Sequence, residues 1–394
     1  MIYFLHPKKN GNIGGIETII YEIVKHASLS DNSIGLLDYE NSPLVARLKK
    51  DDINFKLIII EEDLTSTVGS SLKETDVLVV FNNSVKIIPL RVSINVKVIV
   101  WDVYYPYWKK NYLSIFNHNS ANKLFEAMVS KHGIISMDED FKEQVKYEYG
   151  QDIPIVPPPV KALDYNNGCN FSPRKICYIG RNEHWKNIPL ANFIIDSVRY
   201  IKDFEIDIYT DDHVAIENEL QKIIGPSIMN VKIRYFGGLY GHDLHERING
   251  YDFGVAMGMS ALLLSTLKVP TLILDSASDI LSLEGYKYRW LGQSKRLYDV
   301  GMAFDNSMGC FLGGEQLGVK MTELESNRNC IITLNSELLE RFKVERLLVA
   351  LTLTSSTTQL RVKDFNLLYS GFIGVGNKLL IRLKRRFFCK IYNW

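Results

Sequence analysis

The sequence predicts an α/β fold with two domains, each built on a mainly parallel sheet. Short apolar runs recur along the chain with helical or polar segments between them, which is the pattern of βαβ units. Most of these runs are continuous rather than alternating, which suits strands covered on both faces. A third observation is the run Pro157-Pro158-Pro159, which favours a stiff extended connector between two such series.

Composition narrows the class of protein. A chain of 394 residues has room for two or three domains. The formal net charge of +1 provides no general field for nucleic acid, so we expect no nucleic-acid partner. The 5 cysteines are scattered without metal-ligand spacing, which favours reduced thiols in a cytoplasmic protein and no metal site. Residues 1–5 are too short for a secretory signal, and no stretch is suited to span a membrane.

The first domain is predicted to cover residues 1–160 and to be Rossmann-like. Its first strand leads into a glycine-rich loop, where Gly14 and Gly15 let the backbone approach a ligand closely. A helix with one apolar face follows, and its first turn carries Glu17. A plain tight turn without a ligand explains the same glycines. Further strands are expected at residues 34–37, 57–60, 77–81, 96–101 and 133–137.

Asp102 directly follows the strand expected at residues 96–101, and the aromatic-rich segment 103–108 comes after it. An acid at the carboxyl end of a central strand is well placed to face a ligand, because ligands of open α/β sheets bind beyond these ends. The aromatic side chains suit a platform for a sugar ring. A loop or capping aspartate beside aromatic residues that pack on one another is the alternative.

The second domain is predicted at residues 161–355, and one stretch near its start organises the chain. The apolar run 176–179 stops at Gly180 and is followed by two cations, Arg181 and Lys186. A helix is expected to open just after them, at Ile188-Pro189. Cations beyond the carboxyl end of a parallel strand suit a phosphate-bearing ligand. An ordinary loop with two solvated cations is the alternative.

Two later strand ends extend this picture. Gly237 follows the strand expected at residues 231–236, and Gly258 follows the one at 253–257. Ser260 is predicted to cap the next helix, whose free N–H groups near Ser260 and Ala261 would attract an anion. A capped helix without a ligand is the alternative. Strands are also expected at residues 204–209 and 271–274, residues 276–335 are assigned only loosely, and residues 336–353 are expected to be helical.

The C-terminal segment, residues 356–394, ends in a basic tail. Residues 378–394 contain several lysines and arginines, no acid, and apolar residues near one helical face. This composition fits a segment that lies on an anionic membrane surface, where each basic residue contributes about 1 kcal/mol. A helix docked on the body of the protein with solvated charges is the alternative.

Five segments in order resemble the motifs of retaining glycosyltransferases with the GT-B fold, the group that includes glycogen synthase-like and bacterial polysaccharide enzymes. These segments are Gly14-Gly15-Ile16-Glu17, Ile155–Val160, Tyr178–Asn187, Phe236-Gly237-Gly238, and Tyr251–Ser260 followed by Val269-Pro270-Thr271. The resemblance reaches from the first loop to about Asp275. One departure concerns the glutamate that the family usually has seven residues before the proline, because this chain has Leu263 there.

The resemblance implies two Rossmann-like domains that face each other across a cleft, an acceptor domain followed by a donor-nucleotide domain. The resemblance implies catalytic roles for Asp102, Arg181 and Lys186. The residues implied to bind the donor are Gly180, Arg181, Lys186, Gly237, Gly258, Ser260 and Ala261, and those of the acceptor-side loop are Gly14, Gly15 and Glu17. No DxD-type metal motif accompanies them, since Asp211-Asp212 lie in another loop, so we expect no metal and no cofactor.

The function expected from this resemblance is transfer of a sugar from a nucleotide-sugar donor to a saccharide or lipid-linked saccharide acceptor. Such an enzyme would be retaining and metal-independent. It would serve cell-surface polysaccharide synthesis, such as lipopolysaccharide O-antigen or capsule, as a cytoplasmic protein at the inner face of the membrane. Two other hypotheses remain open. In the first, the chain is a degenerate relative that has lost catalysis and acts as a binding or scaffold protein, as Leu263 suggests. In the second, it is another two-domain enzyme of this fold that uses a sugar nucleotide, such as an epimerase.

Overall fold

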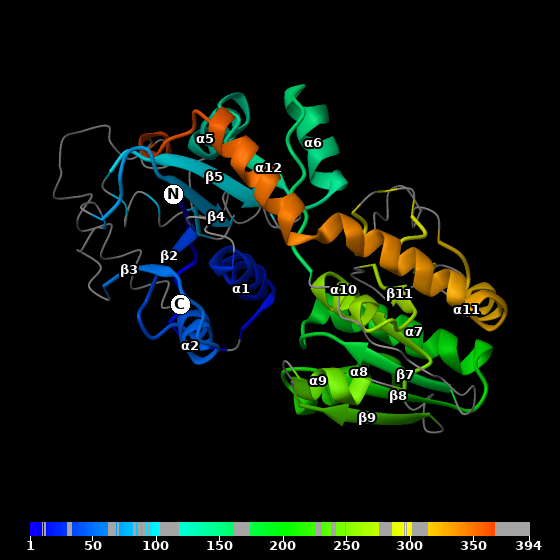
Figure 1. The fold of residues 1–394 in the computed structure, drawn as a ribbon. Helices are drawn as coiled ribbons and strands as arrows, with labels where there is room; N and C mark the ends of the chain where they lie inside the picture. Colours follow the sequence, from blue (N-terminus) through cyan, green and yellow to red (C-terminus); the bar gives the residue numbers. More distant parts are fainter. Residues whose placement is uncertain are drawn as a thin grey trace. The chain divides into compact units, whose positions relative to one another are not determined.

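The computed structural model describes residues 1–366 apart from residues 10, 12, 30–33, 62–67, 69–70, 82–83, 86–87, 89–91, 93, 103–117, 161–173, 226–230, 238–241, 249, 276–285, 295, 297 and 302–313. These residues form two compact units, one of residues 1–159 with 344–366 and one of residues 160–343. Each unit has its own sheet and core (Figure 1). The predicted aromatic segment after Asp102 and the basic tail lie outside the described residues.

The first unit contains a six-stranded parallel sheet in the order β3-β2-β1-β4-β5-β6. Its strands are β1 (Ile2–Leu5), β2 (Ile34–Asp38), β3 (Lys56–Ile59), β4 (Val77–Phe81), β5 (Lys97–Asp102) and β6 (Ile134–Ser136). The predicted strands are confirmed at nearly the expected bounds. Strands β2 and β4 are buried along their whole length, because central strands of a parallel sheet are covered on both faces.

Local sequence explains where the helices of this unit begin and end. The helices are α1 (Gly15–Ser28), α2 (Pro43–Lys50), α5 (His118–Ser130), α6 (Glu139–Tyr149) and α12 (Val344–Thr357). Ser42 caps α2 by accepting a hydrogen bond from Val45 N at 3.1 Å, and a proline occupies the first helical position. Asp138 caps α6 in the same way, and Gly150 ends it with a left-handed backbone at φ 68°.

The second unit also has six strands, in the order β12-β11-β10-β7-β8-β9. They are β7 (Arg174–Ile179), β8 (Phe204–Tyr209), β9 (Lys232–Phe236), β10 (Phe253–Ala256), β11 (Thr271–Ile273) and β12 (Arg289–Trp290). The five parallel strands agree with the prediction. The short antiparallel strand β12 pairs with β11 at the edge and falls in the region that the sequence left loosely assigned.

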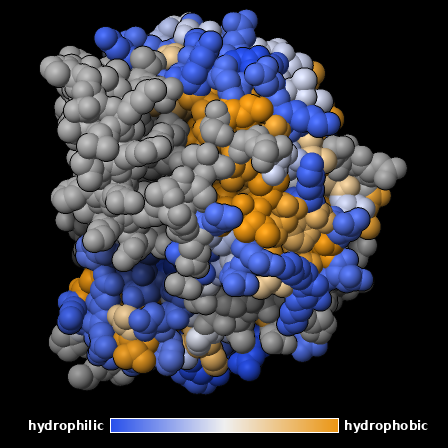
Figure 2. All heavy atoms as spheres, turned by 90° about the vertical axis from the view of Figure 1, so that its left-hand side faces the viewer, coloured by the Kyte–Doolittle hydropathy of each residue, from blue (hydrophilic) through white to orange (hydrophobic). Residues whose placement is uncertain are grey.

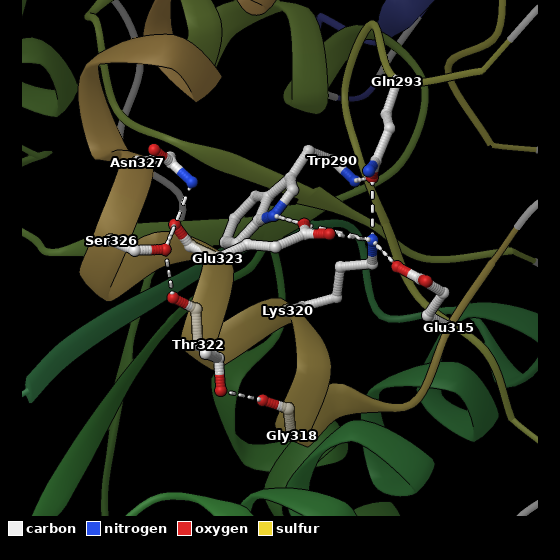
Figure 3. A network of polar contacts seen from close by, with 9 residues as sticks. All are labelled: Trp290, Gln293, Glu315, Gly318, Lys320, Thr322, Glu323, Ser326 and Asn327. Atoms are coloured by element: carbon white, nitrogen blue, oxygen red, sulfur yellow. Dashed lines mark hydrogen bonds and ion pairs between the residues drawn. The ribbon is translucent and has the colours of Figure 1, made fainter.

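The helices of the second unit are α7 (His184–Tyr200), α8 (His213–Ile224), α9 (His242–Ile248), α10 (Met259–Thr266) and α11 (Leu317–Leu339). A polar network around one buried lysine joins α11 to the edge strand (Figure 3). The Lys320 ammonium has an exposed fraction of 0%. It donates to Gln293 Oε1 and Glu323 Oε1, each at 3.1 Å, and also to Glu315. Because Trp290 Nε1 donates to Glu323 Oε2 at 2.9 Å, the network fixes β12 against α11.

The chain returns to the first unit earlier than predicted. The sequence predicted one helix over residues 336–353 and a second domain that extends to 355. Instead α11 ends at Leu339, a 3₁₀ turn covers Glu340–Phe342, and α12 begins at Val344 within the first unit. On α12 the side chains of Leu347 and Leu351 are buried there, and beyond the helix Thr358 Oγ1 donates to Val98 O of β5 at 3.3 Å. The crossing between residues 159 and 160 lies beside the predicted boundary.

Exposed apolar side chains are present on both units. On the face drawn in Figure 2, hydrophobic residues form one broad patch that borders on hydrophilic residues. Large apolar side chains that are exposed in the first unit include Leu29, Ile59, Val349 and Leu353. None of the helices within the described part of the chain is long and apolar enough to cross a membrane.

Candidate functional site

Both sheets have a switch point at which the strand order reverses. In the second unit the switch lies between β7 and β10, and in the first unit it lies between β1 and β4. Ligands of open α/β sheets bind beyond the carboxyl ends of the strands at such points. The predicted cationic stretch follows β7, and the predicted anion-binding helix follows β10. Because β7 and β10 are parallel neighbours, both segments lie at the carboxyl end of the second sheet.

The segment after β7 is shaped by a close approach at Gly180. A Cβ atom there would overlap the hydroxyl group of Tyr178, so only glycine fits without movement. Gly180 N donates to Tyr209 O at 3.1 Å, and Asn182 N donates to Asp211 Oδ1 at 2.7 Å. These bonds tie the segment to the end of β8. The sequence had placed Asp211 apart from the donor candidates, and the structure brings it beside them.

Helix α7 begins at His184, before the predicted start at Ile188-Pro189. Lys186 and Asn187 therefore belong to its first turn, where the N–H of each donates to Glu183 O at 2.8 and 3.0 Å. Pro189 is tolerated close to the helix start, where it removes one backbone hydrogen bond. The Asn187 side chain donates to Asn182 Oδ1 at 2.7 Å, which fixes the turn that precedes the helix.

The two predicted cations differ in their surroundings. Arg181 is 57% exposed and forms an ion pair with Glu183 Oε1 at 3.1 Å. The Lys186 ammonium lies over the Trp185 ring, 4.9 Å from its centre, and no carboxylate of the described residues lies within 4.0 Å of it. Burial, and then the charge of Arg181, lower the pKa of Lys186 from 10.5 to about 8. Lys186 is therefore a partly desolvated cation that forms no ion pair within the described part of the chain, although the more distant charges of Glu183 and Asp211 partly offset the lowering of its pKa.

The hydroxyl of Tyr178 lies beneath this segment. The side chain is 1% exposed, and among the described residues its hydroxyl has no hydrogen-bond partner. Burial, followed by the negative charges of Asp211 and Glu183, raises its pKa well above the usual value. Tyr178 therefore stays neutral and provides a donor at the carboxyl end of β7.

The predicted cap of α10 was wrong. Gly258, not Ser260, is the N-cap residue, with φ 62° and ψ −138°, and no side chain caps the helix. Only glycine adopts this backbone readily. Gly258 N donates to Val300 O at 2.6 Å, and Ala261 N donates back to Gly258 O at 3.1 Å. The Ala261 N–H is thus engaged by the N-cap residue, whereas Ser260, in the first turn of α10, remains a candidate anion contact.

Residues around the start of α10 are largely apolar. Leu263, at the position of the family's glutamate, is partly buried and packs on the same core cluster as Met259, Ile179 and Phe236. Gly237 follows β9 and is exposed, with nothing within 4 Å of a Cβ placed there. The carboxyl end of the second sheet thus carries cations near β7 and apolar side chains near β9 and α10.

In the first unit, Glu17 is a buried anchor. The sequence assigned it to the acceptor-side loop, but its side chain is 6% exposed. Oε2 accepts from Gly14 N at 2.9 Å, while Oε1 lies 2.8 Å from Lys8 Nζ and 3.3 Å from His6 Nε2. Burial raises the pKa of Glu17, but the contacts with His6 and Lys8 outweigh it and lower the pKa to about 2. Glu17 therefore fixes the end of the glycine-rich loop at Gly14, where α1 begins.

The strand ends beside β1 carry further polar groups. Ser84, after β4, lies 3.4 Å from His6 Nδ1, so His6 sits between a hydroxyl and a carboxylate at the switch point. The Asp38 carboxylate, after β2, accepts from Lys8 N at 3.3 Å and from Ser42 Oγ at 2.6 Å. Asp102 is the last residue of β5 and is 1% exposed. Because β4 separates β5 from β1, Asp102 lies two strands from His6.

Several of these residues were not predicted from the sequence. The sequence contains a usable signal for His6 and Lys8, because polar residues that follow the first strand lie at the carboxyl end of the sheet, where ligands bind. Arg289 had none, since it lies in β12. It is 2% exposed and pairs with Asp275 and Asp299, and its Nε donates to Asp299 Oδ2 at 2.6 Å. The pair with Asp299 holds the segment whose Val300 carbonyl accepts from Gly258. In the described residues, no cluster of three or more metal-ligating side chains is present.

Several of the solved structures that resemble this chain are glycosyltransferases. A glycosyltransferase from Rickettsia africae matches with 14% identity and a TM-score of 0.54, over 90% of this chain and 98% of its own. TarM of S. aureus, a variant in complex with fondaparinux, α-GlcNAc-glycerol and UDP, matches with 10% identity and a TM-score of 0.58, over 90% and 99%. Anabaena HepE, in complex with UDP and glucose, matches with 12% identity and a TM-score of 0.55, over 90% and 99%.

No protein family and no curated protein matches the sequence. At these identities the structural likeness establishes the fold alone. The chain has the two-domain GT-B architecture of these glycosyltransferases, with one α/β unit of residues 1–159 and 344–366 and one of residues 160–343. The predicted fold class is thereby confirmed.

Proposed function

We propose that this protein is a nucleotide-sugar-dependent glycosyltransferase. The observation that carries the proposal is Lys186, a partly desolvated ammonium in the first turn of α7 without a carboxylate partner among the described residues. It lies at the switch point of the second sheet, close to Arg181. A diphosphate is the ligand whose charge matches two adjacent cations at this place. Related folds bind UDP, as TarM and HepE do, which supports a nucleotide-sugar donor.

The chemistry follows from where charge develops. When the bond between the anomeric carbon and the diphosphate breaks, negative charge grows on the leaving phosphate oxygen. Fixed cations and N–H groups lower the barrier most when they already point at that oxygen. Arg181 and Lys186 fill this role in the proposal, with the first N–H groups of α10 near Ser260. These groups supply the needed charge without a metal ion, so we propose a metal-independent reaction.

In the first unit, the loop of Gly14 and Gly15 and the side chain of Asp102 are proposed to orient the acceptor. Holding the acceptor hydroxyl at the right distance contributes rate through proximity. We propose a saccharide or lipid-linked saccharide acceptor and a role in cell-surface polysaccharide synthesis. Retention of configuration rests on the resemblance of the motifs.

The basic tail supports a location at the cytoplasmic face of a membrane. Flotation of the full-length chain with vesicles of anionic lipid tests this part of the proposal. Replacing Lys384 and Arg385 with glutamine is expected to reduce co-flotation, because each charge contributes about 1 kcal/mol at such a surface. Unchanged flotation of this variant would remove the membrane from the proposal.

A thermal-shift panel of UDP, GDP, dTDP and CMP tests the donor site. A ligand that binds only the folded state raises its stability by RT ln(1 + [L]/Kd). One nucleotide is expected to raise the melting temperature, and Lys186→Ala is expected to abolish the shift. Lys222→Ala, at an exposed position of α8, serves as the matched control. No shift with any nucleotide would contradict the proposal.

A second candidate function is binding without catalysis. It is favoured by Leu263, an apolar residue in the core cluster at the place of the family's glutamate. Donor hydrolysis or sugar transfer by the wild-type chain, lost in Arg181→Ala, would exclude this alternative. Nucleotide binding without any turnover would favour it.

A further inference from the structure

The carboxylate of Glu183 is held on both sides by donors of the segment that starts α7. Oε1 pairs with Arg181 at 3.1 Å, and Oε2 accepts from Trp185 Nε1 at 2.6 Å. Glu183 is the N-cap residue of α7, yet its side chain makes no capping hydrogen bond. Its charge is therefore directed away from the helix and toward the guanidinium.

Trp185 connects this pair to the second cation. Its ring N–H holds Glu183, and its face lies 4.9 Å from the Lys186 ammonium. Arg181 is thus neutralised from within the protein, while Lys186 has no such partner in the described part of the chain. An anion that binds Lys186 therefore finds the nearby guanidinium of Arg181 already paired with the carboxylate of Glu183.

We propose that Glu183 competes with the donor diphosphate for Arg181, which weakens retention of the nucleoside diphosphate product. This inference rests on the proposed function of the site. A guanidinium offers a fixed fork of donors to carboxylate and phosphate alike, and the two anions cannot share its same edge. The side chains of Arg181 and Glu183 are 57% and 34% exposed. Ion pairs with this exposure are weak and exchange readily.

The competition predicts a gain of affinity when the carboxylate loses its charge. Glutamine at position 183 keeps an oxygen for the Trp185 N–H and removes the charge that opposes the phosphates. Isothermal titration with UDP, GDP and dTDP is expected to show 3- to 10-fold tighter binding by Glu183→Gln of whichever nucleotide binds the wild type, or about 0.7–1.4 kcal/mol. The dissociation rate measured by stopped flow is expected to fall by a similar factor.

Two further variants separate charge from structure. Glu337→Gln makes the same charge change at an exposed position of α11 and is expected to leave affinity unchanged. Glu183→Asp keeps the charge and is expected to bind no more tightly than the wild type. The gain in Glu183→Gln is expected to shrink at high salt, because the interactions at this partly exposed site are screened.

The outcomes distinguish the inference from the function on which it rests. A purely structural Glu183 would anchor Arg181 and Trp185 for the ligand, so its loss would weaken binding. Unchanged or weaker nucleotide binding by Glu183→Gln, with the wild type still binding, overturns this inference alone. If the wild type binds none of the three nucleotides, the proposed function fails, and the inference fails with it.

Discussion

Replacing Lys186 with methionine is expected to stabilise the second unit while it abolishes nucleotide binding. The reason is that the ammonium is partly desolvated and lies near Arg181, without a carboxylate partner in the described residues. In the absence of a ligand, burial and the charge of Arg181 outweigh the favourable charges of Glu183 and Asp211, so the charged form is disfavoured on balance. Methionine keeps the length and the apolar contact with the Trp185 ring and removes the charge.

The expected magnitude follows from the pKa. Lys186 shifts from 10.5 to about 8, which at about 1.4 kcal/mol per unit corresponds to about 3 kcal/mol against the charged folded form. The side chain keeps part of its surface in water, and contact with the Trp185 ring returns about 0.5–1 kcal/mol. We therefore expect Lys186→Met to raise the free energy of unfolding by about 1–2 kcal/mol at neutral pH.

The pH dependence gives the sign of the effect. Below about pH 8 the lysine is charged in both the folded and the unfolded state, so the penalty is fully present. Between about pH 8 and 10.5 the folded lysine loses its proton while the unfolded one keeps it, so wild-type stability rises with pH. The advantage of methionine is therefore largest at neutral pH and disappears toward pH 10.5.

Urea denaturation of both proteins at several pH values measures this difference, because groups common to both chains cancel. Lys222→Met, at an exposed position of α8, is the control and is expected to change stability little at any pH. A loss of stability in Lys186→Met at neutral pH, or a difference that does not depend on pH, would refute the reasoning. Such a result would mean that the ammonium has a favourable partner in the folded protein.

Three further predictions concern the two units. Gly258→Ala is expected to lower the free energy of unfolding by about 1–3 kcal/mol in urea denaturation, because alanine is strained in a backbone at φ 62° and ψ −138°. Gly237→Ala is the control and should be tolerated, since there is open space around that position. Equal effects of the two substitutions would contradict this prediction. Glu17→Gln is expected to cost about 1–3 kcal/mol at neutral pH. Its difference from wild type should shrink as pH falls from 4.5 toward 2, because the unfolded carboxylate takes up a proton in this range while the folded one stays charged; a difference constant over this range would argue against the buried pairing. Leu351→Ala in α12 is expected to cost about 2–5 kcal/mol through lost packing in the first unit, while Leu353→Ala, at 63% exposure, should be near neutral in the same assay.

The positions of most strands along the chain could be predicted because these strands are continuous apolar runs that end at glycine or polar residues. The boundary of the second unit could not be predicted in the same way. Residues 336–353 have uninterrupted helical character in sequence, and only the packing of Leu347 and Leu351 in the first unit shows where one helix stops and the next begins. Strand β12 has two residues, too few for any periodic signal.

The sequence by itself determined the order of strands and helices and the identity of the cations that follow β7, since both depend on neighbours along the chain. Tertiary structure decided which of these groups keeps its charge unpaired. Glu183 neutralises Arg181, Lys8 and His6 hold Glu17, and Arg289 joins Asp275 to Asp299. Glu17 and Arg289 lie in a helix and a strand, and their partners lie in loops about ten residues away along the chain. The strength of an ion pair depends on distance and burial, which the order of residues does not contain.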